Sequence, residues 1–348
     1  MITSKHTITT KLSTDIYIDR GILGKLEKIL KPYGFTQYVL LCDSYTKKLI
    51  PRFASPVHIY QIAQGEESKD IQTVLDLLTF MQARNFDRKS AIIALGGGVV
   101  GDVATLAASL YYRGIACVQV PTTLLSQVDS ALGGKGGVNV GKHKNTLGVI
   151  YQPRVIIVDT SLPLSLPEEQ FRSGLGEIVK YAIAMDKTLF GLLEQREKFD
   201  AKSLQEVIER SIKLKMNIVE KDPFDTKGVR QIVNFGHTLG QAIELETNLL
   251  HGEAISIGMA FATALSMEMR LLSKEDGKRA LALLTKYNLP TTLSKKFSPT
   301  TIEKALSQDK KAIAGTPRFV LIKGLGEGIT NQEIPITMIR KILPEVIV

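Results

Sequence analysis

Two of the chain's five histidines fall in one short stretch rich in residues that could do chemistry. The stretch runs from Asn234 to Gln241 and resumes at His251. Its spacing is helical, and His237, Gln241 and Glu244 share one helix face because they stand at i, i+4 and i+7. Catalytic zinc sites often combine two histidines with one carboxylate, so the two imidazoles could hold one zinc ion. Alternatively, each is a hydrogen-bonded packing residue.

An acidic residue in an otherwise apolar helical segment could complete such a site. Segment 173–186 carries Glu177 and Lys180 at i and i+3, hence on one face of a helix. The two could form a surface salt pair, or Glu177 could be the third metal ligand.

Three glycines, Gly96 to Gly98, end an apolar strand just before a predicted helix. Backbone N–H groups and the positive helix end can meet a pyrophosphate there, and glycine permits close approach. The spacing is neither G-x-G-x-x-G nor a P-loop, so context favours a dinucleotide over a tight turn. Asp43, Glu66 and Lys69 could hold ribose hydroxyls, or could be exposed charges.

Residues 128–145 contain five glycines, three lysines and two asparagines without clear periodicity. So long a loop inside a compact domain is usually functional or disordered, and the flanking apolar strands argue against disorder. Lys135 and Lys144 can offer point charges to a phosphate, and Asn145 a polar contact. The alternative is a flexible surface loop.

The composition limits the classes of protein. The 348 residues favour two domains, and 44% hydrophobic with 23% charged residues is ordinary for a globular chain. The net charge of +9 could indicate nucleic acid, but the cations are dispersed, Trp is absent, and a small anionic substrate explains the surplus equally well. We expect no membrane span, no secretion signal, and two buried free thiols, Cys42 and Cys117, in the cytoplasm.

The elements that must position these residues follow from periodicity. Alternation at 8–18 predicts an edge hairpin. Apolar runs predict strands at 39–43, 57–62, 91–95, 116–120 and 155–159, with helices at 68–83 and 103–112, hence a Rossmann-like, mostly parallel α/β domain over residues 1–162.

Residues 163–348 are predicted to form an all-α metal- and substrate-binding domain. Its helical segments are 168–198, 202–221, 235–246, 253–272, 275–287 and 301–308, and only 319–322 resembles a strand.

Taken together, ordered blocks along most of the chain resemble 3-dehydroquinate synthases, of the sugar-phosphate cyclase group. The blocks with the most specific motifs are 97–102, 112–114, 121–125, 128–145, 176–181, 234–238, 251–253 and 309–311. The resemblance implies a homodimeric enzyme of the shikimate pathway. It would convert 3-deoxy-D-arabino-heptulosonate 7-phosphate to 3-dehydroquinate and phosphate, with NAD oxidising and then reducing the substrate before an aldol closure.

The resemblance also implies roles for residues at matching positions. Glu177, His237 and His251 would bind Zn²⁺ or Co²⁺. NAD would meet Asp43, Glu66, Lys69, Gly97, Gly98, Asp102, Thr122, Thr123, Lys135, Lys144 and Ser165. The catalytic residues would be Lys135, Lys144, Asn145, Lys180, Arg230 and Asn234. Asp129, Lys215 and Lys310 would bind the substrate, and Arg113 would reach the phosphate of a neighbouring subunit.

Three positions depart from the family pattern. Gln241 stands where the family has a second His, so any proton transfer there is lost or moved to water. Gly136 replaces Thr, and Ser165 stands where Thr is usual. The alternatives that remain are a cyclase for another sugar phosphate, such as a valiolone or amino-dehydroquinate synthase, an NAD-dependent polyol dehydrogenase, and a basic nucleic-acid-binding protein.

Overall fold

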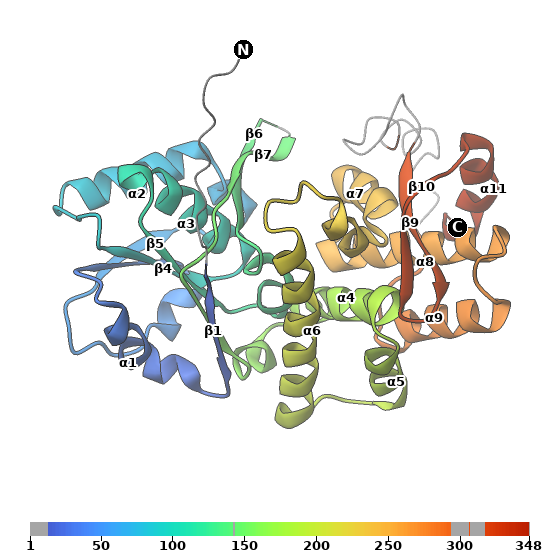
Figure 1. Ribbon diagram of the computed structural model, residues 1–348, viewed down its shortest axis with the longest axis horizontal. Helices are drawn as coiled ribbons and strands as arrows, with labels where there is room; N and C mark the ends of the chain where they lie inside the picture. The colour runs from blue at the N-terminus through green and yellow to red at the C-terminus, as the bar shows by residue number, and fades with distance from the viewer. Residues whose placement is uncertain (1–12, 142, 294–305, 307–316, 348) are drawn as a thin grey trace, which may run out of the picture. The chain divides into compact units, whose positions relative to one another are not determined.

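The computed structural model describes residues 13–141, 143–293, 306 and 317–347 (Figure 1). Internal contacts divide them into two compact units. The first holds the described residues up to Pro121 together with Gly133–Asp159, and the second holds Thr122–Leu132 with the described residues from Thr160 onward. The functional division at residue 162 stays a prediction.

The first unit is built on a six-stranded parallel sheet with the order β1-β8-β5-β4-β2-β3. The central strand β4 is buried along its whole length, as a strand covered on both faces must be. This sheet confirms the predicted α/β class. The strands are β1 (Asp15–Asp19), β2 (Tyr38–Asp43), β3 (His58–Ile62), β4 (Ala91–Gly96), β5 (Ala116–Pro121) and β8 (Val155–Asp159).

Helices cover both faces of this sheet, with α2 (Ile71–Gln82) and α3 (Gly98–Leu110) on one side and α1 (Leu26–Leu30) on the other (Figure 1). The apolar side of α2 packs with α3 over alternate residues of the central strands. Short 3₁₀ helices connect these elements at Ile22–Lys25, Lys31–Tyr33, Thr46–Leu49, Glu66–Ser68 and Tyr111–Arg113.

Three expectations for the first unit need correction. The described part of the predicted hairpin, β1, lies at the sheet edge but pairs in parallel with β8, because alternation identifies a half-exposed strand without naming its partner. Helix α3 begins at Gly98, so the glycine loop includes its first turn. The segment expected as a loop forms an antiparallel hairpin, β6 (Lys135–Val140) and β7 (His143–Ile150), which extends beyond the sheet (Figure 1).

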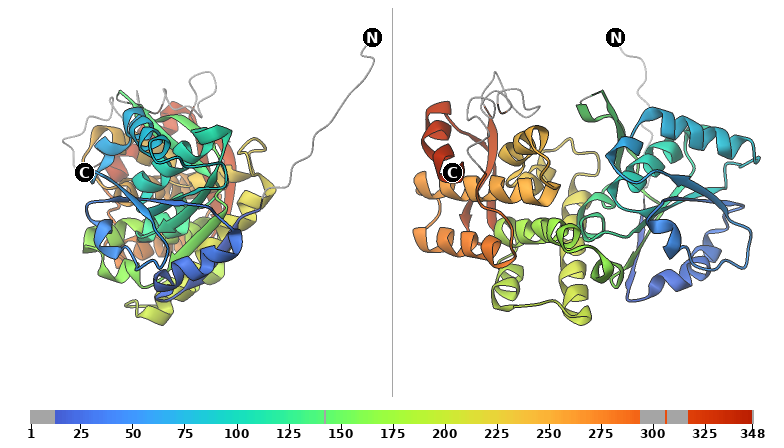
Figure 2. Two further views of the ribbon diagram at one scale, coloured as in Figure 1. Left: turned by 90° about the vertical axis from the view of Figure 1, so that its left-hand side faces the viewer. Right: turned by 180° about the vertical axis from the view of Figure 1, so that it is seen from behind.

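The second unit is mainly helical, as predicted. Helix α8 is buried along most of its length and packs against α4, α7 and α9 (Figure 2). The α-helices are α4 (Glu168–Met185), α5 (Lys187–Gln195), α6 (Ala201–Lys221), α7 (His237–Glu246), α8 (His251–Glu268), α9 (Lys274–Lys286) and α11 (Ile336–Val346). Short helical segments lie at Ser126–Ser130, Leu162–Ser165 and Val229–Asn234.

Some elements of the second unit differ from expectation. The predicted strand is β9 (Arg318–Gly324), but it pairs with a second strand, β10 (Glu327–Glu333), whose polar sequence hides its alternation. Helix α11 was not predicted, and segment 168–198 is broken at Asp186. Of the predicted helix 301–308, only Leu306 lies within the described residues. Across the described chain, every helix is too short or too polar to span a membrane.

Candidate functional site

The second unit brings Glu177, His237 and His251 together. One potential ligand atom from each lies within 4.8 Å of the other two. Glu177 comes from α4, and the two histidines are the first residues of α7 and α8. Oε1 of Glu177 lies 3.9 Å from Nε2 of His237 and 3.5 Å from Nε2 of His251. Two ligands of a tetrahedral zinc ion would be about 3.3 Å apart, so the three atoms could surround one ion with little adjustment.

The two oxygens of Glu177 have different surroundings. Oε2 accepts a hydrogen bond from Nζ of Lys180, and both side chains are fully buried. Oε1 is buried too, and within the part of the chain that the structure describes no donor hydrogen-bonds to it. An unsatisfied carboxylate oxygen that faces two imidazole nitrogens fits a cation, because a buried polar atom without a partner is costly.

Both imidazoles are oriented through their other nitrogen. Nδ1 of His237 lies 3.3 Å from the carbonyl oxygen of Phe235, and Nδ1 of His251 lies 3.0 Å from Oε2 of Glu244. An acceptor at Nδ1 favours the tautomer in which that nitrogen carries the proton. Burial lowers the pKa of His251, but Glu177 and Glu244 outweigh it and raise the value to about 10, so without a metal this ring carries both protons. A bound metal would replace the proton on Nε2, and each ring would then present that nitrogen to the ion, as metal-binding histidines usually do.

Glycines beside the three residues allow their helices to approach closely. A Cβ on Gly252 would lie 2.0 Å from the carbonyl oxygen of Ser173, and one on Gly176 would lie 2.9 Å from that of Gly252. Helices α4 and α8 therefore meet backbone to backbone next to Glu177 and His251. On the other side of α8, a Cβ on Gly258 would lie 1.9 Å from the carbonyl oxygen of Gly236, which precedes His237 at a φ of 80°.

A second charged cluster lies in the same unit, around Asp129. Its Oδ1 accepts hydrogen bonds from the hydroxyl of Tyr181 at 2.6 Å and from Nζ of Lys215 at 2.5 Å. Asp129 lies in the turn Ser126–Ser130, Tyr181 on α4 and Lys215 on α6. Tyr181 follows Lys180 directly, so one turn of α4 serves both this cluster and the Glu177 cluster.

The electrostatics of the two clusters are coupled. Burial alone would raise the pKa of Asp129, but Lys215 and Lys180 hold it well below its usual range. Burial likewise raises the pKa of Glu177, and Lys180 outweighs it and lowers the value to about 2. Burial lowers the pKa of Lys215 despite the nearby carboxylates. At neutral pH the unit therefore offers ionised carboxylates and a lysine that gives up its proton more readily than usual.

The remaining predicted residues of the second unit have other hydrogen-bond partners or surroundings. Arg230 is buried, and its guanidinium donates to the carbonyl oxygen of Pro223 at 3.3 Å, whereas Asn234 is half-buried at the end of its 3₁₀ turn. Thr123 caps the turn that carries Asp129 by exchanging hydrogen bonds with Ser126. Thr122 is buried, and Ser165 is exposed. Lys310 lies outside the described residues.

In the first unit, the glycine segment joins the end of β4 to α3, with Gly97 as N-cap and Gly98 as first residue of the helix. This arrangement of strand, glycines and helix N-terminus fits a pyrophosphate. Asp102, in the second turn, forms an ion pair with the buried Lys69, with 2.5 Å between Nζ and Oδ2. Asp43, at the end of β2, accepts hydrogen bonds from Thr46 at 2.7 and 2.8 Å.

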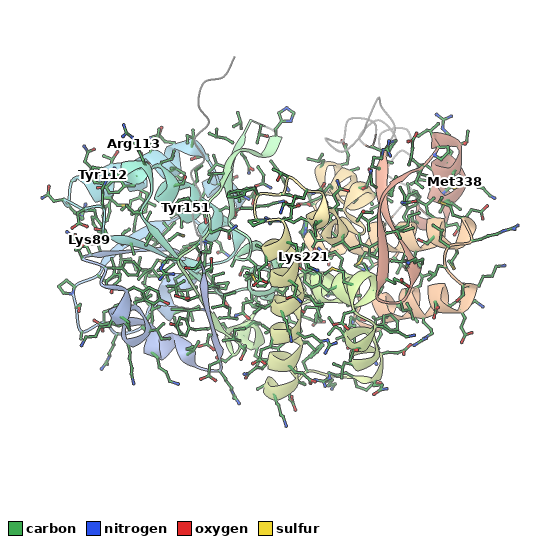
Figure 3. The ribbon with its side chains drawn as sticks, viewed as in Figure 1. Lys89, Tyr112, Arg113, Tyr151, Lys221 and Met338 are labelled. Atoms are coloured by element: carbon green, nitrogen blue, oxygen red, sulfur yellow. The ribbon has the colours of Figure 1, made fainter. Side chains whose placement is uncertain are left out.

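Apart from the buried Lys69, the predicted cationic residues of the first unit are exposed. Lys135 begins β6, and Lys144 and Asn145 lie on β7. Gly136 packs directly on α3, since a Cβ there would lie 2.4 Å from Cβ of Thr105, which leaves no room for the threonine of the family pattern. Arg113 lies beside Tyr112 at an exposed turn after α3 (Figure 3).

Three residues that contact the predicted site were not among the predicted site residues. They are Tyr181, whose hydroxyl holds Asp129, Glu244, which holds His251, and Asn139, which hydrogen-bonds Glu66. Glu244 shares the helix face of His237, and that spacing was a usable signal. The other two contacts join residues more than 50 positions apart, so nothing local indicates them.

Two family models match adjoining parts of the chain. The one described as 3-dehydroquinate synthase N-terminal matches residues 59–173, and the one described as 3-dehydroquinate synthase C-terminal matches residues 174–312. The chain belongs to the 3-dehydroquinate synthase family. Membership confirms the resemblance seen in the sequence motifs.

Individual relatives agree with this assignment. The 3-dehydroquinate synthase of Sulfurovum sp. is 40% identical over 293 residues, which is 83% of each chain. A 2-epi-5-epi-valiolone synthase from Streptomyces hygroscopicus subsp. jinggangensis, solved with NAD⁺ and Zn²⁺ bound, has a TM-score of 0.86 at 26% identity over 99% of both chains. A 2-deoxy-scyllo-inosose synthase, complexed with carbaglucose-6-phosphate, NAD⁺ and Co²⁺, has a TM-score of 0.83 at 29% identity, covering 95% of this chain and 96% of its own.

Proposed function

We propose that this chain converts 3-deoxy-D-arabino-heptulosonate 7-phosphate to 3-dehydroquinate and phosphate, with NAD and Zn²⁺ or Co²⁺ as cofactors. Its relatives at 36–43% identity are 3-dehydroquinate synthases, whereas the cyclases for other sugar phosphates are 26–30% identical. The structural observation that carries the proposal is the buried, unsatisfied Oε1 of Glu177 facing the Nε2 atoms of His237 and His251.

When bound, the metal supplies Lewis acidity toward substrate oxygens, and NAD takes up a hydride and returns it in the same turnover. Lys180 holds Oε2 of Glu177, so Oε1 keeps its direction. The acceptors at the two Nδ1 atoms fix both rings. Lys215, held by Asp129, supplies a buried cation to an anionic substrate, and its lowered pKa suits proton transfer.

The other predicted roles belong to this proposal. Gly97, Gly98, Asp102, Glu66 and Lys69 would hold NAD at the helix N-terminus and its surroundings, together with Asp43, Thr122, Thr123 and Ser165. Lys135, Lys144, Asn145, Arg230, Asn234 and Lys310 would surround the substrate. We propose a homodimer in which Arg113 reaches the partner's site. The buried free thiols Cys42 and Cys117 support a reducing, cytoplasmic location.

The test is phosphate release from the heptulosonate phosphate at an NAD concentration far below that of the substrate. We expect many turnovers per NAD, loss of activity with a chelator, and recovery when Zn²⁺ or Co²⁺ is restored. Glucose 6-phosphate is the control substrate and should release no phosphate. Accumulation of NADH in step with the substrate consumed, or release that a chelator leaves intact, would contradict the proposal.

A further inference from the structure

Asn139 forms a bulge in the β6–β7 hairpin. Val138 pairs with Leu147 and Val140 pairs with His143, so the register shifts at Asn139. Its backbone N–H leaves the hairpin and donates to the carbonyl oxygen of Lys69 at 2.8 Å. Bulges free a backbone group from the ladder and redirect the side chain, and they are common next to active sites.

The side chain of Asn139 joins two segments at once. Nδ2 donates to Oε1 of Glu66 at 2.9 Å, and Oδ1 accepts from the backbone N–H of Asn145 at 2.9 Å. Asn145 has a left-handed φ of 54°, a conformation that a held N–H helps to maintain. Asn139 is half-buried. Its backbone N–H and its Nδ2 both bond the turn Glu66–Lys69, and its Oδ1 bonds strand β7.

The two segments have different tasks in the proposed function, on which this inference rests. Residues 66–69 would lie at the adenosine end of NAD, and Lys69 is fixed by its ion pair with Asp102 near the start of α3. Asn145, whose backbone N–H Asn139 holds, would face the substrate. We propose that Asn139 is a positioning residue that couples them, so that NAD held at the Glu66–Lys69 turn orders the substrate-binding strand of the hairpin.

The chemistry of asparagine suits this position. An amide donates to a carboxylate and accepts from an N–H at the same time. Aspartate loses the donor and places a second negative charge against Glu66, whereas alanine loses both bonds. Glu66 is exposed, so water competes for its hydrogen bond with Asn139. The hydrogen bond from the backbone N–H of Asn139 to the carbonyl oxygen of the buried Lys69 is therefore the stronger of the two.

The experiment compares the wild type with Asn139→Ala, Asn139→Asp and Glu66→Ala, measuring NAD dissociation constants by calorimetry and amide exchange of a peptide spanning residues 143–150. In the wild type, NAD should slow exchange of this peptide. In Asn139→Ala that protection should disappear, and the dissociation constant should rise about 5- to 10-fold. Asn139→Asp should bind NAD at least as weakly as Asn139→Ala. Metal content should not change. His143→Ala, an exposed change in the same hairpin, is the control and should behave as wild type.

Glu66→Ala keeps the inference testable if the Asn139 variants fold poorly, because Glu66 is exposed. Without NAD, amide exchange of the 143–150 peptide should be faster in Glu66→Ala than in the wild type, even though Glu66 lies far from this peptide in the sequence. The double variant with Asn139→Ala should show less than the summed effects. NAD binding with unchanged exchange in the wild type, or full protection in Asn139→Ala, overturns the inference and leaves the proposed function intact. A wild type that binds no NAD contradicts the proposed function itself.

Discussion

At the scale of single residues, the site depends on partners that keep each reactive group in one state. Tyr181 is an instance: it is fully buried, and burial together with Asp129 raises its pKa well above the usual range. Its hydroxyl therefore stays protonated and donates to Asp129 at any physiological pH. Asp129 in turn remains an acceptor and holds the ammonium group of Lys215. Removing the hydroxyl should loosen Lys215 without touching Glu177.

We expect Tyr181→Phe to lower kcat/KM about 10- to 100-fold, because a hydrogen bond to a charged group contributes about 1.5–3 kcal/mol. Metal content, measured by atomic spectroscopy, should stay at the wild-type level. The matched control is Tyr287→Phe, which removes a buried hydroxyl bonded to the carbonyl oxygens of Leu193 and Arg196. It should lose stability but keep kcat/KM. Equal kinetic losses in both variants would show that Tyr181 acts only through folding.

At the scale of elements, the sequence predicted those helices and strands that hydrophobic periodicity and composition reveal. The parallel strands were predictable because strands buried on both faces are continuous apolar runs. The β6–β7 hairpin was not predictable, because its glycines have no side chains that could alternate between apolar and polar. The hairpin needs glycine where its strands pack closely: a Cβ on Gly137 would lie 2.8 Å from the carbonyl oxygen of Leu147. The three candidate metal ligands could be nominated from residue type and motif. Their proximity could not, because it depends on contacts between glycines on separate helices.

The sequence contained a sign of the break between α4 and α5, an aspartate suited to cap a helix, but the helical periodicity continues across it. Asp186 ends α4, and its carboxylate accepts from the backbone N–H groups of Thr188 and Leu189 as the N-cap of α5. The same carboxylate accepts two hydrogen bonds from Arg210 of α6, at 2.6 and 2.9 Å. Asp186 therefore ties the helix of Glu177 and Tyr181 to the helix of Lys215.

Asp186→Asn should keep the cap and lose the ion pair, lowering the free energy of unfolding by about 1–2 kcal/mol, and Asp186→Ala should lose both, for about 2–3 kcal/mol. Burial raises the pKa of Asp186, but Arg210 and the N–H groups outweigh it, so its folded value lies below the unfolded one. The stabilisation is thus present above the unfolded pKa and is lost as pH falls through the folded pKa.

Urea unfolding of both variants at pH 7 and near pH 3 checks this dependence. The difference in the free energy of unfolding between wild type and Asp186→Asn should have its full size at pH 7 and be smaller near pH 3. Asp200→Asn serves as the control, since Asp200 caps α6 but its hydrogen bonds come from Ser203 and not from an arginine. Hydrogen bonds from Ser203 lower the pKa of Asp200 as well, so the effect of Asp200→Asn should also shrink at acidic pH, but at pH 7 it should be smaller than that of Asp186→Asn. A gap that stays constant with pH would show that the ion pair with Arg210 contributes nothing.

At the scale of the whole molecule, motif order along the chain predicted the family, but the compact units are not continuous in sequence. Residues Thr122–Leu132, which carry Asp129, belong with the helical unit although they precede the strands β6 to β8. Periodicity cannot reveal this, because it reports local structure only. A second feature of this scale lies at the turn after α3. Tyr112 and Arg113 both have left-handed φ values, 48° and 68°, at an exposed turn (Figure 3).

Such backbone strain costs about 1–3 kcal/mol per residue and is kept mainly where it serves function. The turn is held by a hydrogen bond from Arg88 to the carbonyl oxygen of Tyr112 at 3.1 Å, and Tyr112 and Leu110 are about half exposed. An exposed arginine flanked by apolar side chains suits a contact between copies of the chain. In a twofold dimer the contact is reciprocal, so each copy would lend its Arg113 to the other.

The final prediction uses that reciprocity. Arg113→Ala and Glu177→Gln should each be inactive as homodimers, the first lacking the lent arginine and the second a metal ligand. A heterodimer of the two, isolated with two affinity tags, combines an intact Glu177 in one subunit with an intact Arg113 in the other. One of its two sites is complete, so it should recover about half of the wild-type rate of phosphate release. If Arg113 served its own subunit, both sites would be defective and the heterodimer would be as inactive as its parents. Arg52→Ala, an exposed change in the same unit, should be fully active and controls for loss of a surface charge.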